Sequence, residues 1–165
     1  MISKQTQSQD MISKQSQSHD MFFTQGFNAA RDRLWQMDLW RRRGLGQLSA
    51  VLGPRYINQD IANRLFLYRG DMEREWYAYG QNARSTVSAF TKGINAYVDY
   101  VEANPRTLPL EFRLLDYRPS RWSPSDVVRI RTHGLSRNAT SEVFRAQILC
   151  QHGSDAAAQW KTLEP

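Results

Sequence analysis

Apolar residues recur at intervals of three and four along the chain from residue 23 to residue 37. The positions are Phe23, Phe27, Ala30, Leu34 and Met37. This spacing places them on one face of an amphipathic helix. Asp20 stands just before the pattern, where a short side-chain acceptor can cap the first free N–H groups. Gly44 and Gly46 follow it, so the pattern predicts a helix over about 20–42 and then a turn.

The rest of the chain reads as further helices joined by short breaks. Asn104-Pro105 stops one helix, and Ser123-Pro124 starts another, because proline is tolerated in a first helical turn. No segment alternates with a period of two, so we expect a mainly α fold with few or no strands. The predicted helices span about 47–53, 58–69, 71–81, 84–103, 109–115, 124–136 and 140–151.

The N-terminus is a tandem repeat of ten residues. MISKQTQSQD at 1–10 is followed by MISKQSQSHD at 11–20. The unit is too short for a solenoid repeat, and its polar composition predicts a disordered segment over residues 1–19. We therefore divide the chain into this segment, a helical domain at 20–152 and a tail or spacer at 153–165.

The chain of 165 residues is long enough for one domain with its own core, and its net charge is +6. A basic helical module that binds nucleic acid is one interpretation. The other is that arginines pair with carboxylates and cover a partner subunit. We favour the second, because the basic residues are scattered and fit no nucleic-acid motif. No apolar stretch is long enough to span a membrane, and Cys150, the single cysteine, is predicted to be buried.

The run from Phe22 to Gly53 closely resembles the opening helix of the α subunit of penicillin acylases. The resemblance continues in order through about residues 18–150. It is carried by Asp60 and Arg64, by Gly93-Ile94-Asn95-Ala96-Tyr97, by Leu108-Pro109-Leu110-Glu111-Phe112, and by Ser136 to Glu142. It implies the helical α-subunit portion of an N-terminal nucleophile hydrolase αβ heterodimer. The N-terminal strand and the αββα core of the β subunit are lacking from this sequence.

In that family the nucleophile is the first residue of the β subunit, usually serine, and its own α-amino group acts as the base. An α-amine with a pKa of about 7.7–8 suits that task at neutral pH. We expect no catalytic residue in this chain. Gly153-Ser154 is interpreted as a helix break and not as a processing site, and the three histidines form no zinc signature.

The resemblance also implies the site residues. Leu135, Ser136, Arg137 and Asn138 would line the acyl pocket. Glu142 would be one ligand of a structural Ca²⁺ shared with the β subunit; no organic cofactor is expected. The alternative for Glu142 is an acid in the first turn of a helix, favoured by the helix dipole.

The predicted function is therefore part of an amidohydrolase that cleaves a linear amide, either a β-lactam side chain or another N-acyl compound. The expected partners are the β subunit of the same precursor and a small acyl amide, with neither nucleic acid nor a membrane. The resemblance implies a periplasmic or extracellular enzyme, but the N-terminus lacks the apolar region of a signal peptide, which suggests a truncated frame. A non-functional remnant of an acylase gene stays an alternative.

Overall fold

The computed structural model of this protein describes residues 2–131 and 137–152, and within them the side chains of residues 18–131 and 143–151. The described residues form helices and contain no strand, which confirms the predicted mainly α fold. None of their helices is both long and apolar enough to cross a membrane. The elements are α1 (Ile2–Leu45), α2 (Ser49–Leu52), η1 (Pro54–Tyr56), α3 (Ile57–Phe66), α4 (Met72–Tyr79), α5 (Ala83–Ala103), η2 (Pro105–Thr107), α6 (Leu110–Leu114), α7 (Pro124–Arg129) and α9 (Arg137–His152).

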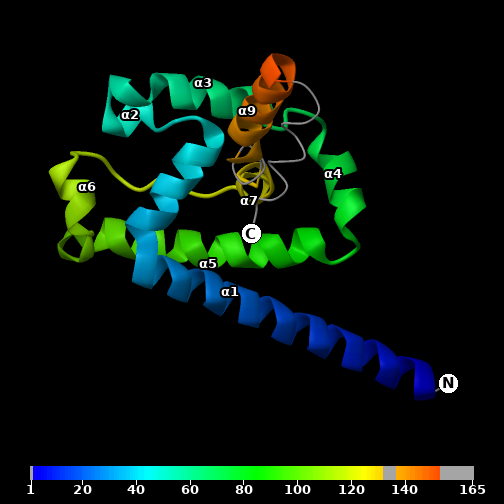
Figure 1. Cartoon of the computed structure of the whole chain (residues 1–165). Coiled ribbons are helices and arrows are strands. Elements are labelled where there is room, and N and C mark those ends of the chain that lie inside the picture. Colours follow the sequence, from blue (N-terminus) through cyan, green and yellow to red (C-terminus); the bar gives the residue numbers. More distant parts are fainter. Residues whose placement is uncertain (1, 132–136, 153–165) are drawn as a thin grey trace.

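Helices α1 and α5 cross each other and form the centre of the fold (Figure 1). Ala30 and Leu34 of the predicted stripe are buried there, as expected. Phe27 and Met37 are partly buried against the same core, whereas Phe23 is 39% exposed, so the stripe is buried in its middle and not at its start. The core residues are Ala30, Leu34, Ile94, Tyr97, Val98, Val101, Leu108, Phe112 and Trp122.

Two glycines allow the backbones of α1 and α5 to touch. A Cβ atom on Gly26 would lie 2.0 Å from the carbonyl oxygen of Phe90, and one on Gly93 would lie 2.0 Å from that of Phe23. No side chain fits in so small a space, since packed interiors leave almost no free volume. Gly26 and Gly93 therefore set the distance between the two central helices.

Helix α1 differs from the predicted helix over 20–42. It begins at Ile2, so residues 2–19 are helical where the sequence predicts a disordered segment. No glycine or proline precedes Gly26, and Lys and Gln are good helix formers, so nothing local stops the helix. The helix has a kink at Arg33, whose φ of −145° and ψ of 34° are not helical. The division of the chain at residues 19 and 152 stays a prediction.

Candidate functional site

Helix α9 carries three of the five predicted site residues: Arg137, Asn138 and Glu142. Leu135 and Ser136 lie outside the described residues. Helix α9 starts at Arg137, earlier than the predicted residue 140, so Glu142 lies in its second turn and no acid lies in its first turn. The helix-dipole explanation of Glu142 therefore loses its basis, because the dipole acts mainly within the first turn.

Asn138 and Glu142 are one turn apart, and positions i and i+4 share a face of a helix. The predicted pocket residue and the predicted metal ligand thus lie along the same face of α9. In the described part of the chain, no three acidic, histidine or cysteine side chains come together in a way that could hold a metal. A carboxylate on α9 could therefore take part in such a site only together with oxygen ligands from elsewhere.

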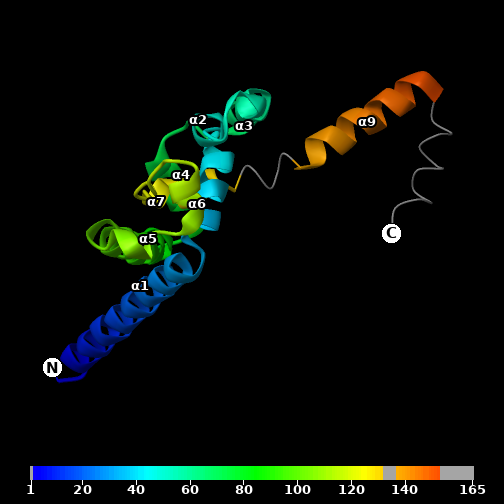
Figure 2. The ribbon, with the colours of Figure 1, turned by 90° about the vertical axis from the view of Figure 1, so that its left-hand side faces the viewer.

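Helix α9 extends away from the other helices (Figure 2). Val143 is 58% exposed and Leu149 is 42% exposed, so apolar side chains face solvent along it. Cys150 is exposed as well, and its prediction as a buried thiol was wrong. The error arises because the apolar pattern of this helix was taken to face the core of the same chain. The side chains of Arg137, Asn138 and Glu142 lie outside those that the structure describes, so the structure gives only their positions along α9.

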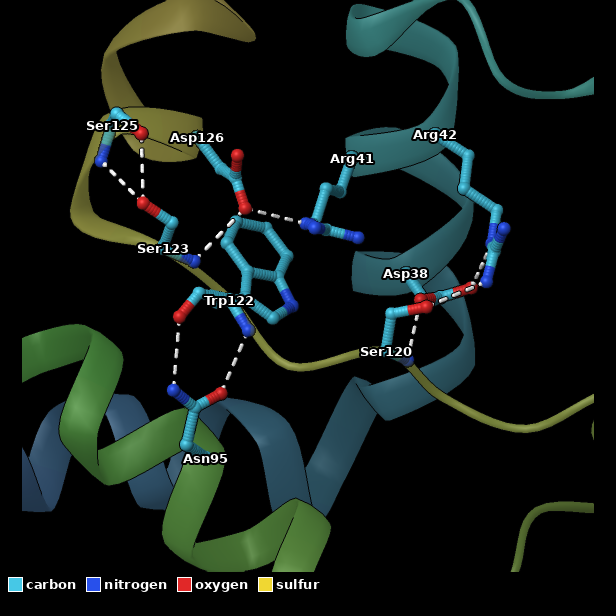
Figure 3. Close-up of polar contacts among 9 residues, drawn as sticks. All are labelled: Asp38, Arg41, Arg42, Asn95, Ser120, Trp122, Ser123, Ser125 and Asp126. Carbon is cyan, nitrogen blue, oxygen red and sulfur yellow. Dashed lines mark hydrogen bonds and ion pairs between the residues drawn. The ribbon is translucent and has the colours of Figure 1, made fainter.

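The motif residues of α1 hold the loop that precedes α7. Asp38 is 1% exposed and accepts a hydrogen bond from Arg42 Nε at 2.7 Å and one from the backbone N–H of Ser120 at 3.3 Å (Figure 3). Arg42 also donates to Ser120 Oγ at 2.9 Å and lies over the ring of Tyr117. Burial, and then the negative charge of Asp38, raise the pKa of Tyr117 to about 12. These side chains are paired with one another, as buried charges must be.

Asn95 on α5 binds the same loop from the other side. Its side-chain amide donates to the carbonyl oxygen of Trp122 at 2.9 Å, and its side-chain oxygen accepts from the Trp122 N–H at 2.8 Å (Figure 3). Asp126 completes a capping box with Ser123 at the start of α7 and accepts from Arg41 Nε at 2.8 Å. The asparagine of the GINAY motif therefore has an architectural role, and sequence reasoning missed its partner because the two residues are 27 positions apart.

The motif on α3 holds the turn that follows α1. Asp60 accepts hydrogen bonds from the backbone N–H groups of Leu48 and Ser49, at 2.9 and 2.7 Å, and from Ser49 Oγ at 2.6 Å. Arg64 Nε donates to the carbonyl oxygen of Gly46 at 2.7 Å. The motif residues described here are thus satisfied within the fold, so they position backbone segments and are not poised for acid–base chemistry.

An open hollow of about 590 Å³ lies beside the kink of α1. Arg31 and Asp32 form an ion pair at its wall, with both side chains more than half exposed. The hollow is lined by residues 31–36, Leu39, Trp40, Pro109 and Glu111, among which there is no serine, cysteine or histidine. It therefore offers no nucleophile of the kind that acyl transfer uses.

The chain was compared with protein families and with known proteins. A family model described as penicillin amidase matches residues 15–164. The chain is 30% identical over 132 residues to penicillin G acylase of Escherichia coli, an alignment that covers 78% of this chain and 16% of that protein. It is 35% identical over 99 residues to the penicillin acylase 2 proenzyme of Pseudomonas sp. strain SE83, covering 60% of this chain and 12% of that protein.

A third relative is the acyl-homoserine lactone acylase QuiP of Pseudomonas aeruginosa, 29% identical over 143 residues, with 85% of this chain and 16% of that protein covered. The chain thus spans less than a fifth of the length of these relatives. Among solved structures, it is similar to thermostable penicillin G acylase from Alcaligenes faecalis, with a TM-score of 0.67 and 28% identity. That match covers 89% of this chain and 82% of the solved chain.

Proposed function

Because the chain belongs to the penicillin amidase family, we propose that it is the α-subunit part of an enzyme that hydrolyses linear amides. The observation that carries this proposal is the family match over residues 15–164, nearly the whole sequence. The substrate would be a β-lactam side chain or another N-acyl compound. Relatives named as penicillin acylases and as an acyl-homoserine lactone acylase support that range.

In the proposed enzyme, the β subunit would carry the nucleophile and this chain would form part of the acyl pocket. In the described residues, buried Asp38, Asp60 and Asp126 all accept hydrogen bonds from groups of the fold, so none of them is available as a general base. The nucleophile would be the N-terminal serine of a β subunit, with its own α-amine as base. Its hydroxyl would attack the amide carbonyl, the amine would leave, and water would release the acyl group from the ester. The α chain would line the acyl pocket with Leu135, Ser136, Arg137 and Asn138.

We also propose that Glu142 supplies one carboxylate ligand to a structural Ca²⁺. Ca²⁺ takes six to eight oxygen ligands, and a glutamate carboxylate is a fitting donor. The other ligands would come from the β subunit, where the ion would join the two chains.

Two arginines of the run at residues 41–43 do not fit the basic-module alternative. Arg41 and Arg42 are each only 12% exposed and are paired with Asp126 and Asp38. Their charges are therefore not available to the phosphates of a nucleic acid, which such modules must neutralise.

The proposal is tested by the genomic sequence beyond Pro165 and by the activity of its product. We expect the frame to continue through a Gly-Ser-Asn-type junction into a β subunit. The matured enzyme should release a chromogenic leaving group from a phenylacetyl or a long-chain acyl amide, and a Ser→Ala change at the junction should abolish this. Residues 1–165 alone should release none. Turnover by the isolated chain that Ser154→Ala abolishes would overturn the proposal, and unrelated sequence directly after Pro165 would favour a gene remnant.

A further inference from the structure

On helix α3 the polar side faces the protein and the apolar side faces solvent, which is the reverse of an ordinary surface helix. Its polar residues Asp60 and Asn63 are buried, at 3% and 7% exposure. Asp60 binds the backbone of residues 48 and 49, and Asn63 Nδ2 donates to the carbonyl oxygen of Arg43 at 2.7 Å. The polar face of α3 therefore faces the chain, because backbone groups of the turn after α1 need partners there.

The apolar face of α3 is consequently left in solvent. Ile57, Ile61 and Leu65, which we call the α3 stripe, follow one another at intervals of four and are 47%, 54% and 76% exposed. Phe66, next to the last of them, is 54% exposed. Positions i, i+4 and i+8 lie along one side of a helix, so the stripe is continuous. Contiguous exposed apolar residues mark sites where another surface binds.

Exposed arginines flank the α3 stripe along the chain. Between residues 54 and 70, the sequence has three arginines, Arg55, Arg64 and Arg69, and a single acid, Asp60. The three arginines are exposed and Asp60 is buried. A complementary partner would therefore present an apolar centre with carboxylates around it.

We propose that the α3 stripe is a docking surface for the β-subunit part of the same enzyme. This inference rests on the proposed function. A second copy of this chain fits less well, because a self-contact through α3 would bring the same arginines together from both sides. The alignments cover 16% or less of the relatives, so most of each relative lies outside the part that this chain matches and is long enough to supply the complementary surface.

Two matched substitutions test the α3 stripe in the two-chain enzyme. Leu65 on α3 and Leu114 on α6 are the same residue type, at 76% and 73% exposure. With a tagged β subunit, we expect Leu65→Lys to weaken retention of the α chain by ~10-fold or more and Leu114→Lys to change it by less than ~3-fold. Circular dichroism of each α chain checks that the substitution leaves the helices intact. If the tagged β subunit retained both α-chain variants equally and intact enzyme assembled, the α3 stripe would not be the docking surface. The proposed function would be unaffected.

A photo-crosslinking amino acid at Ile61 gives a second readout that does not depend on stability. A covalent α–β product in the active enzyme is the expected result, and the same probe at Arg106, an exposed residue on η2 after α5, is the control. An α–α product would assign the stripe to a second copy and overturn the proposal. Binding of the α chain to phosphatidylglycerol vesicles that Leu65→Lys abolishes, without an α–β product, would assign it to a membrane surface and overturn it as well. If no β subunit assembles at all, the proposed function fails together with this inference.

Discussion

Replacing Gly93 by alanine tests the contact between the two central helices. The new Cβ atom would lie 2.0 Å from the carbonyl oxygen of Phe23 and 2.8 Å from the backbone nitrogen of Phe27. Atoms of these types normally stay more than ~3 Å apart, so α1 and α5 must separate by roughly 1 Å. The obstacle is backbone, and it cannot move aside as the end of a flexible side chain can.

The magnitude follows from two opposing effects. Overfilling a packed site, together with the looser packing around Ala30 and Ile94, should destabilise the fold by about 3–5 kcal/mol. The higher helix propensity of alanine returns about 1 kcal/mol. The net loss in the free energy of unfolding should be about 2–4 kcal/mol, which corresponds to a fall in Tm of about 5–15 °C in a domain of this size.

Urea and thermal unfolding, followed by circular dichroism at 222 nm, measure this change. Lys92→Ala is the matched control, since Lys92 is the exposed neighbour of Gly93 on α5, and its effect should stay within about 0.5 kcal/mol. A Gly93→Ala protein as stable as the wild type, or stabilised by about 1 kcal/mol as at an open helical position, would refute the close contact of α1 and α5.

Three further predictions concern the polar network and the predicted metal ligand. Asp38→Ala leaves Arg42 buried without its carboxylate and should destabilise the protein by about 3–5 kcal/mol in urea unfolding, whereas Asp32→Ala at the exposed pair should change stability by less than about 1 kcal/mol. The pKa of Tyr117 is about 12 in the folded protein and about 10 in the unfolded chain, so the unfolded chain loses this proton first as the pH rises. The free energy of unfolding should therefore fall between pH 10 and pH 12, and Tyr117→Phe should reduce that fall. Glu142→Gln should lower the calcium content of the two-chain enzyme without changing helicity, and equal calcium in both proteins would remove Glu142 from the predicted site.

The positions of the helices could be predicted from the sequence alone. The helix expected at about 84–103 is α5 at Ala83–Ala103, and the one expected at 109–115 is α6 at Leu110–Leu114. Proline, glycine and apolar spacing act within a few residues of their own position, so local sequence carries this information. Two segments are exceptions. Residues 2–19 are helical although a disordered segment was predicted, because a polar helix and a disordered polar segment have the same composition. The helix predicted over about 124–136 ends earlier, as α7 at Arg129, and residues 130 and 131 form a turn.

The candidate site could be predicted only as a set of residues. The resemblance identified Arg137, Asn138 and Glu142 together, and the structure places them on one helix. Their side chains are outside the described ones, and α9 extends away from the other helices (Figure 2). In the proposed enzyme a β subunit would complete the site, so its arrangement in space would depend on both chains, of which this sequence specifies one.

Which face of each helix is buried was decided by tertiary structure. The stripe on α1 and the stripe on α3 look alike in sequence, yet Leu34 is 2% exposed and Leu65 is 76% exposed. Hydrophobic periodicity determines that a helix has an apolar side but not which neighbour covers it. On α3 the polar side forms hydrogen bonds with backbone groups of residues 43–49, and this turns the apolar side outward. Those groups come from another part of the chain, so their demand for hydrogen bonds exists only once the helices have packed.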